Sequence, residues 1–512
     1  MPIQITQFSP GVLTAAQLNA LVDAVVAKFN GQVTTGDILF PLTAGGNIDM
    51  SQFDLLHVYK FWQSRNLSER ASSVTFQDVL DQVNTAGGGI VLLPANSTEI
   101  VGTTGVTVGT NTVIMGQGDT SIFNTSGTFT NHMFRNKANG NSGIMFVGCR
   151  IVGPTSGAFD AIAMTRTQNL KFVDCLLETY QKNAVSLRSD SAGSSCLDTH
   201  FERCRFQMAT TASCVGLLAQ DVQRLHVSNC KFDFQVSSSV GISLTALGAT
   251  SNLEQVHIEH NDFIHTAGAT QTDVLVAAGA TNGIAAMSIL DNDIKGASGT
   301  NTFGIDVDGG VYTVNASLRI CDNDIRGQFD SAAVRIRNCA MFHVDRNDIN
   351  ISGTGIGILT GATARSGAVA SCGLFSCKNN IVVAAATCYV FTVPASSTMR
   401  GTIANNTGSC SSGTVAEFEI WSTGANPTTA TFDTIITGNM VDDASASVAS
   451  WRCYTGIGAT QGGRCGAANN SNLIFSANNA ISTTFGGAGA NDDFHNVSEG
   501  TTRMYQALGN IN

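Results

Sequence analysis

One short pattern of polar and apolar positions recurs between about residues 144 and 481. A β-type segment ends in Cys or Asn, and this residue is followed by any residue and then usually by an apolar one. The twelve copies begin at Cys149, Cys175, Cys204, Cys230, Asn261, Asn292, Asn323, Asn347, Asn379, Asn405, Asn439 and Asn479. Their spacing varies from 24 to 40 residues, as expected when loops of different length join equivalent strands. Without helical periodicity between the copies, the pattern predicts a solenoid of parallel strands with one coil per repeat.

The first residue of each copy is expected to form a ladder along the solenoid axis, because stacked coils lie about 4.8 Å apart. The first four coils contribute thiols and the later ones contribute amides. An Asn side chain can hydrogen-bond to the coils above and below, and Cys is a small buried substitute at such a bend. We therefore predict reduced, buried thiols rather than a disulfide framework, although the chain contains 14 Cys.

The N-terminal third contains two predicted helices. One lies within residues 14–29, where apolar residues recur at helical spacing. The other begins after Thr75 and ends at Gly87-Gly88-Gly89, before the strand-like segment Ile90 to Pro94. We predict an N-terminal attachment and trimerisation region (1–70), a capping helix with the first coils (71–143), the solenoid body (144–481) and a C-terminal cap (482–512).

Residues 74–481 resemble the right-handed parallel β-helix of the pectate-lyase-like superfamily. The resemblance rests on the helix after Thr75, the segments GGGIVLLP and GQGDTSIF, and the Cys/Asn ladder. The segment 36–61 resembles a repeat near the start of bacteriophage tail-fibre and tailspike chains, and the helix before it is similar to their anchoring regions. Together the resemblances imply an all-β, right-handed parallel β-helix with a short helical N-terminal region, in a trimeric tailspike or related virion-surface protein.

Composition and charge narrow the classes of partner. With 53 Gly, 7 Pro and 43% hydrophobic residues, the chain is typical of neither a disordered protein nor a collagen. Its net charge of −11 argues against nucleic acid as a partner, because binding phosphates needs a concentrated positive surface. No apolar run reaches the roughly 20 residues that span a bilayer, and no basic and apolar leader is visible. We expect synthesis in a host cytoplasm, no membrane insertion and no cofactor.

Alternation along one strand of each coil separates inward from outward side chains. The inward column is predicted to contain Ile162, Val185, Val215, Ile242, Val274, Ile305, Val334 and Ile356. The outward column is predicted to contain Thr165, Arg188, Leu218, Thr245, Asp273, Asp306, Asp308, Arg335, Arg337 and Leu359.

Asp306 and Asp308 are the first catalytic candidates. Carboxylates at positions i and i+2 on one face of a strand lie about 7 Å apart, within the range that inverting glycosidases use. We hypothesise that they act as general acid and base, and that Arg335, Arg337 and Arg188 bind an acidic substrate. The alternative is an exposed charge ladder that contributes little to stability.

A second column precedes the ladder and contains His200, His226 and His257, followed by Ser288, Arg319 and His343. Glu202 and Glu259 lie two residues further along. Stacked imidazoles near carboxylates could bind a metal or supply an alternative acid/base pair. The alternative is a polar face that is solvated or packed against another subunit.

Trp421 is a candidate for stacking on a sugar ring, since it follows Glu417 and Glu419 on one predicted strand. The alternative is an ordinary outward strand edge.

These observations favour a homotrimeric phage tailspike or tail-fibre protein on the virion surface. Its N-terminal region would contact other tail proteins, and its solenoid would bind host surface polysaccharide. Whether it also cleaves this polysaccharide, as a hydrolase or a lyase, is left open by the sequence. Two alternatives stand beside this interpretation: a non-catalytic fibre or capsid-decorating protein, and a stand-alone polysaccharide lyase or hydrolase.

Overall fold

The chain divides into two units, residues 1–59 and residues 60–512, and every residue with a described structure belongs to the second. The computed structural model describes residues 65–67, 72–125, 127–154, 159–189, 196–208, 213–236, 238–246, 253–265, 271–278, 284–296, 301–309, 317–360, 373–385, 387–394, 398–410, 418–423, 431–437, 439–443, 451–454 and 464–468. The helix predicted within 14–29, the ladder residue Asn479 and the segment 482–512 lie outside these residues.

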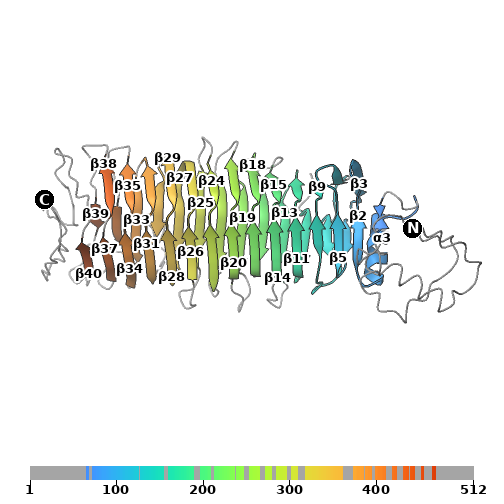
Figure 1. Cartoon of the computed structure of the whole chain (residues 1–512), viewed down its shortest axis with the longest axis horizontal. Coiled ribbons are helices and arrows are strands. Elements are labelled where there is room, and N and C mark those ends of the chain that lie inside the picture. The colour runs from blue at the N-terminus through green and yellow to red at the C-terminus, as the bar shows by residue number, and fades with distance from the viewer. Residues whose placement is uncertain are drawn as a thin grey trace, which may run out of the picture. The chain divides into compact units, whose positions relative to one another are not determined.

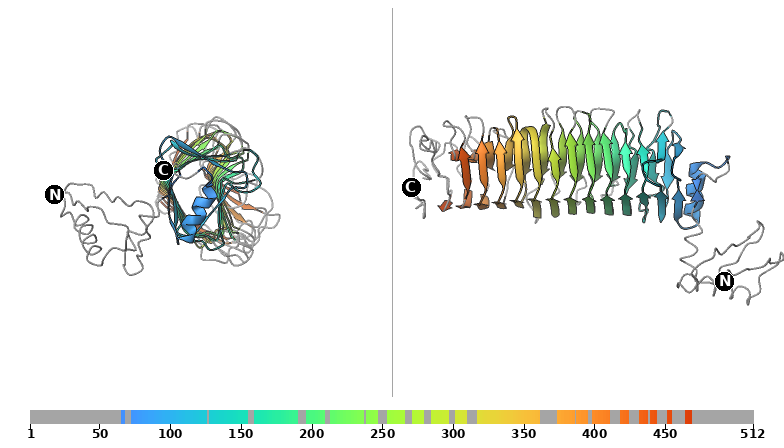
Figure 2. Two further views of the ribbon diagram at one scale, coloured as in Figure 1. Left: turned by 90° about the vertical axis from the view of Figure 1, so that its right-hand side faces the viewer. Right: turned by 45° about the horizontal axis from the view of Figure 1, so that its top comes forward.

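Helix α3 (Phe76–Thr85) lies at the N-terminal end of the stacked coils (Figures 1 and 2). Thr75 begins it with a capping box, because its side chain accepts from the backbone N–H of Asp78 while Asp78 accepts from the backbone N–H of Thr75. The apolar stripe that includes Phe76 is buried, and the Phe76 ring stacks on Phe123 at 5.4 Å between centroids. Gly88, with φ +124°, follows the helix, as predicted.

The remaining described elements are strands that pair in parallel and form a solenoid (Figure 1). Each coil contributes one strand to each of three sheets, which we call A, B and C. Sheet A consists of β1 (Arg65–Asn66), β2 (Gly89–Leu92), β5 (Thr112–Met115), β8 (Met145–Val147), β11 (Gln168–Val173), β14 (Leu197–Glu202), β17 (Gln223–Ser228), β20 (Glu254–Glu259), β23 (Ala286–Leu290), β26 (Ser317–Cys321), β28 (Met341–Asp345), β31 (Leu374–Lys378), β34 (Thr398–Ala404), β37 (Thr431–Thr437) and β40 (Arg464–Ala468).

Sheets B and C share one long strand, β27 (Asp324–Arg337), which runs from one into the other. Sheet B also contains β3 (Ser97–Val101), β6 (Ser121–Thr125), β9 (Arg150–Val152), β12 (Leu176–Glu178), β15 (Arg205–Met208), β18 (Lys231–Phe234), β21 (Asp262–His265), β24 (Asp293–Lys295), β29 (Asp348–Ser352), β32 (Ile381–Ala384), β35 (Thr407–Cys410) and β38 (Met440–Asp443). Sheet C also contains β4 (Val106–Val108), β7 (Phe134–Asn136), β10 (Ile162–Thr165), β13 (Asn183–Arg188), β16 (Val215–Gln220), β19 (Val240–Ala246), β22 (Thr272–Ala278), β25 (Asn301–Asp308), β30 (Ile356–Thr360), β33 (Thr387–Pro394), β36 (Phe418–Thr423) and β39 (Trp451–Tyr454). The predicted all-β parallel solenoid is confirmed.

The Cys/Asn ladder follows the end of each sheet A strand, at the corner between sheets A and B. The backbone N–H and the Nδ2 of Asn292 both donate to Oδ1 of Asn323, at 3.1 and 2.9 Å. The Nδ2 of Asn292 also donates to the carbonyl of Ile258 at 3.0 Å. Because every polar atom of such an amide is bonded, a fully buried Asn is compatible with the corner.

Two ladder positions differ from the prediction. Asn380 and Asn406 occupy the ladder, and not Asn379 and Asn405, since the backbone N–H of Asn380 donates to Oδ1 of Asn406 at 3.0 Å. Both sites read Asn-Asn, and the first Asn of each pair has a left-handed backbone with φ of 56° or 55°. Asn tolerates this conformation, so either residue of the pair satisfied the sequence pattern.

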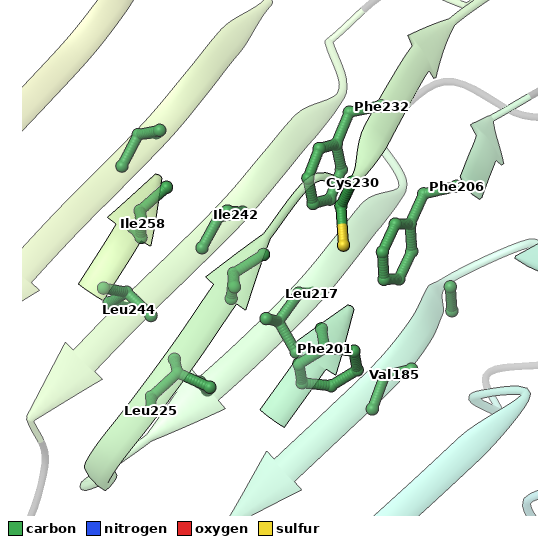
Figure 3. Close-up of a cluster of buried hydrophobic side chains, with 14 of the residues drawn as sticks. Val185, Phe201, Phe206, Leu217, Leu225, Cys230, Phe232, Ile242, Leu244 and Ile258 are labelled. Carbon is green, nitrogen blue, oxygen red and sulfur yellow. The ribbon is translucent and has the colours of Figure 1, made fainter. Parts of the chain in front are cut away.

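The inside of the solenoid is filled by apolar side chains from all three sheets. In the close-up of Figure 3, Phe201, Phe206, Phe232 and their aliphatic neighbours point toward one another between the strands. The rings of Phe206 and Phe232 stack at 4.6 Å between centroids. The eleven cysteines whose side chains are described are free and buried, in agreement with the prediction.

Two inward positions and one outward position were assigned wrongly. Leu217 and Ile358 occupy the inward column, because they are paired in register with Val185 and Val334, whereas Val215 and Ile356 lie two positions before it. Asp273 was predicted outward, but it is fully buried and bonded to His265. It lies at the start of β22, where the equivalent residues Ala184 and Ala333 of other sheet C strands are also fully buried, so strict alternation does not apply there.

Among the described residues, no helix is long and apolar enough to cross a membrane.

Candidate functional site

The outer face of sheet C contains the predicted Asp and Arg residues, in two columns rather than one. The first column runs through Ala163, Ser186, Leu218, Ser243, Leu275, Asp306, Arg335 and Leu359. The second contains Thr165 with Arg188 and, further along, Thr245, Ala277, Asp308 and Arg337. Leu218 and Arg188 were predicted to share one column. They lie in different columns.

Asp306 and Arg335 form a bidentate ion pair on this face. The Nε of Arg335 donates to one carboxylate oxygen of Asp306 at 2.7 Å, and Nη2 donates to the other at 2.5 Å. The guanidinium lies over the ring of Phe303, 3.7 Å from its centroid. Only 3% of the Asp306 side chain and 8% of the Arg335 side chain are exposed. The pair is thus shielded from solvent, and its charges are neutralised locally.

Asp308 and Arg337 continue this cluster at its more exposed edge. The Nη1 of Arg337 lies 3.3 Å from a carboxylate oxygen of Asp308, and the Nδ2 of Asn338 donates to the other oxygen at 2.8 Å. About a quarter of the Arg337 side chain and about a quarter of the Asp308 side chain are exposed. The structure therefore brings all four predicted residues together, but the two arginines are bound to the two carboxylates. Asp308 is the more accessible carboxylate of the two.

Arg188 lies far from this cluster. Four coils separate β13 from β25, which corresponds to about 19 Å along the axis. Its Nη2 lies 2.5 Å from a carboxylate oxygen of Asp160, and its Nε donates to Ser186 at 2.6 Å. The structure thus places Arg188 on the same face as Asp308, but in a separate Arg–Asp pair.

Among the described residues on the outer face of sheet C, three polar atoms are buried and have no hydrogen-bond partner: Nε of Arg135, Oγ1 of Thr245 and Nε of Arg337. Arg135 belongs to the first column, because it is paired in register with Ala163. Neither Arg135 nor Thr245 was among the predicted binding residues. Arg135 precedes the first recurring coil, and an unbonded hydroxyl has no sequence signal.

The histidines lie in one column on the outer face of sheet A, as predicted. His200, His226 and His257 are paired in register on successive strands. The column continues through Ser288, Arg319 and His343.

One contact between an imidazole and a carboxylate joins the histidine column to the neighbouring column, which contains Glu202 and Glu259. The Nε2 of His226 lies 2.6 Å from a carboxylate oxygen of Glu259, and 35% and 28% of these side chains are exposed. Glu202 is instead paired with Arg203. Burial lowers the pKa of His200, and Lys171 and His226 act in the same direction. Within the described part of the chain, no group of three or more His, Cys, Asp or Glu side chains is arranged to hold a metal ion.

The third predicted site cannot be assembled from the described residues. The backbone of Trp421 lies in β36, in register with Thr392, while its side chain lies outside the description. Glu417 also lies outside the described residues. Stacking of Trp421 on a sugar ring stays a prediction.

No protein-family model matches this chain, and no curated protein matches it. Similar solved structures include the tailspike protein of E. coli bacteriophage HK620 in complex with pentasaccharide, with 13% sequence identity and a TM-score of 0.48 over 89% of this chain and 83% of that one. The mannuronan C-5 epimerase AlgE6 A-module of Azotobacter vinelandii has 12% identity and a TM-score of 0.34 over 77% of this chain and 88% of that one. ORF18 of Geobacillus virus E2 has 11% identity and a TM-score of 0.31 over 66% of this chain and 64% of that one.

These likenesses concern the solenoid fold alone. At identities of 11 to 13% and TM-scores below 0.5, no residue role, activity or partner can be carried from these proteins to this chain. The expected fold, a parallel β-helix, is confirmed by the chain's own strands.

Proposed function

We propose that this chain is the solenoid of a tailspike-type virion-surface protein and binds a linear cell-surface polysaccharide along the outer face of sheet C. One observation carries the proposal: Arg135, Thr245 and Arg337 each keep a buried polar atom without a partner on this single face. An unpaired buried polar group costs about 1 to 3 kcal/mol, so a ligand that supplies a partner to each of these three atoms would recover that cost.

The distribution of these atoms favours an extended ligand over a compact one. Four coils separate Arg135 from Thr245, and three more separate Thr245 from Arg337. At about 4.8 Å per coil, the three positions span about 34 Å. A polysaccharide supplies hydroxyl oxygens at regular intervals over such a length. Bound sugars would give each unpaired atom a hydrogen-bond partner once its side chain turns toward the ligand.

The biological setting belongs to the same proposal. The protein is a homotrimer on the virion, residues 1–70 attach it to other tail proteins, and the polysaccharide belongs to the host surface. Analytical ultracentrifugation tests the oligomeric state. We expect a species of about 160 kDa, three times the chain mass of 53.4 kDa, and a monomer would contradict the trimer.

Binding is tested with purified bacterial surface polysaccharides immobilised for biolayer interferometry. We expect at least one to bind, and expect Arg337→Gln to weaken it about tenfold or more, because a hydrogen bond to a charged group contributes about 1.5 to 3 kcal/mol. Arg319→Gln is the matched control, since Arg319 is exposed on sheet A. Equal loss in both variants, or no binding to any polysaccharide, would refute the proposal.

Cleavage of the bound polymer is a second candidate function, favoured by one observation. The Asp308 carboxylate keeps 23% of its side chain exposed on the same face. In this hypothesis Asp306 and Asp308 are the acid and base, and Asp306 must leave Arg335 before it can transfer a proton. Release of reducing ends by the wild type and its loss in Asp308→Asn would support cleavage. Cleavage unchanged in that variant, but lost in Glu259→Gln, would move the active site to sheet A.

A further inference from the structure

The N-terminal end of sheet C carries a second cluster of charged groups, built at the corner where sheet B meets sheet C. His132, Asp160 and Asn183 come from three successive coils, because the backbone N–H of Met133 bonds to the carbonyl of Asp160 and that of Ala161 bonds to Asn183. The Nδ2 of Asn183 donates to one oxygen of Asp160 at 2.7 Å. Asp160 itself is fully buried. This carboxylate therefore organises the groups around it.

His132 is held to Asp160 through its ring nitrogen Nδ1. Its Nδ1 accepts from the backbone N–H of Asp160 at 3.0 Å, which leaves the ring proton on Nε2 when the ring is neutral. Burial lowers the pKa of His132, and the nearby charges of Arg188, Lys182 and Arg135 lower it further against the opposing effect of Asp160. Both effects favour the neutral ring, and 17% of the side chain is exposed.

Two arginines act electrostatically on this ring. About a third of the Arg188 side chain is exposed although two of its nitrogens are bonded to Asp160 and Ser186. The Nε of Arg135 is buried without a hydrogen-bond partner. The cluster contains the carboxylate of Asp160 and the two guanidinium groups of Arg135 and Arg188, so it has an excess of positive charge in a chain whose net charge is −11. Guanidinium groups bind the two oxygens of a carboxylate well.

We propose that this cluster is a subsite for the carboxylate of an acidic sugar. The inference rests on the proposed binding of a polysaccharide along sheet C and names the chemistry of its sugars. Arg135 and Arg188 contact the two carboxylate oxygens, and His132 donates from Nε2. Asp160 positions Arg188 and His132 and does not touch the ligand. The anion supplies the partner that Nε of Arg135 lacks.

The experiment is isothermal titration calorimetry on the full chain with three probes: a uronic-acid hexasaccharide, the same hexasaccharide with its carboxyls reduced to alcohols, and inorganic phosphate. We expect the acidic hexasaccharide to bind at least tenfold more tightly than the reduced one, with an affinity that falls as salt is raised. Arg135→Gln should weaken the acidic hexasaccharide about tenfold. Lys171→Gln removes one exposed charge from sheet A and should leave it unchanged.

The possible outcomes separate this inference from the proposed function. If neutral and acidic probes bind equally, or a polysaccharide without acidic sugars is the only one bound in the interferometry screen, the carboxylate subsite is refuted and polysaccharide binding stands. If phosphate binds as tightly as the acidic hexasaccharide, the cluster is a free-anion site and the inference is refuted. If no polysaccharide binds at all, the proposed function fails with it. A circular dichroism melt of Arg135→Gln confirms that the variant is folded.

Discussion

The amide ladder and the outer face of sheet C are both rows of polar side chains that repeat once per coil, yet their hydrogen bonding differs. In the ladder, Oδ1 of Asn323 accepts two bonds from Asn292, while Nδ2 of Asn323 donates to Asn347 and to two carbonyls. On sheet C, Arg135 and Thr245 keep buried atoms unbonded. The ladder that holds the corner together is complete within the chain, whereas on sheet C the proposed ligand would supply the missing partners.

The Asp306–Arg335 pair lies on the outer face of sheet C, but its hydrogen bonds are made within the chain, as in the ladder. Breaking this pair should have the largest effect on the free energy of unfolding. Asp306→Ala leaves the Arg335 charge in a site that is 8% exposed, and removing one partner of a buried pair costs about 3 to 5 kcal/mol. Urea unfolding measures the change. An Asp306→Leu, Arg335→Met double variant should recover most of the loss, since it removes both charges. A loss below 1 kcal/mol in Asp306→Ala would show that the pair is solvated.

Breaking the ladder should have the next largest effect. Asn323→Ala leaves the backbone N–H and the side chain of Asn292 with fewer partners, at a cost of about 2 to 4 kcal/mol for the buried groups together. Asn323→Cys should cost less, because Cys230 accepts from the backbone N–H of Cys204 at the equivalent position. Thermal unfolding compares the two variants. Equal losses would contradict the idea that thiol and amide are interchangeable there.

Thr245→Val should separate stability from binding. It removes a buried hydroxyl that has no partner and keeps the shape, so we expect the free energy of unfolding to rise by about 1 kcal/mol. The same change should weaken polysaccharide binding several-fold, because the ligand loses a hydrogen bond. Val is also favoured in strands, so Thr199→Val, at a buried hydroxyl without a partner inside the solenoid, is the control. It should stabilise without changing affinity.

The smallest expected effect is on pH dependence. The pKa values of His132 and His200 are lowered, first by burial, so the unfolded chain binds protons before the folded one as pH falls through about 6.5. Stability should therefore fall from pH 7.5 toward pH 5.5. His265 opposes this loss: burial lowers its pKa, but Asp273 and Gln271 outweigh burial and raise it. Its contribution is present below pH 6.5 and is lost as pH rises through the folded value.

Melting temperatures at pH 7.5 and pH 5.5 for the wild type and His132→Gln measure this effect. The variant should lose less stability than the wild type between the two values. Equal losses would show that His132 titrates as it does in the unfolded chain.

The solenoid was predictable because its repeat is local. Each ladder residue and each inward apolar residue is followed by an equivalent one in the next coil, so the pattern needs no long-range information. The prediction failed where two residues fitted one position, as at Asn379 and Asn380. It also failed at Asp273, at the start of β22, where a nominally outward side chain is fully buried.

The site was predictable only in part. Alternation placed Asp306 and Arg335 on neighbouring coils, and the register confirms this. It did not reveal that Asp306 is buried and held at both oxygens, because this depends on side-chain conformations and on the Phe303 ring beneath Arg335. Arg135 was missed because it lies before the first recognisable repeat.

The most direct test of the account is a crystal or cryo-electron microscopy structure with an oligosaccharide of the bound polysaccharide. We predict sugar oxygens within hydrogen-bonding distance of Oγ1 of Thr245 and Nε of Arg337, along the outer face of sheet C. Sugar density on the histidine column of sheet A, with those two atoms still unbonded, would contradict the central claim.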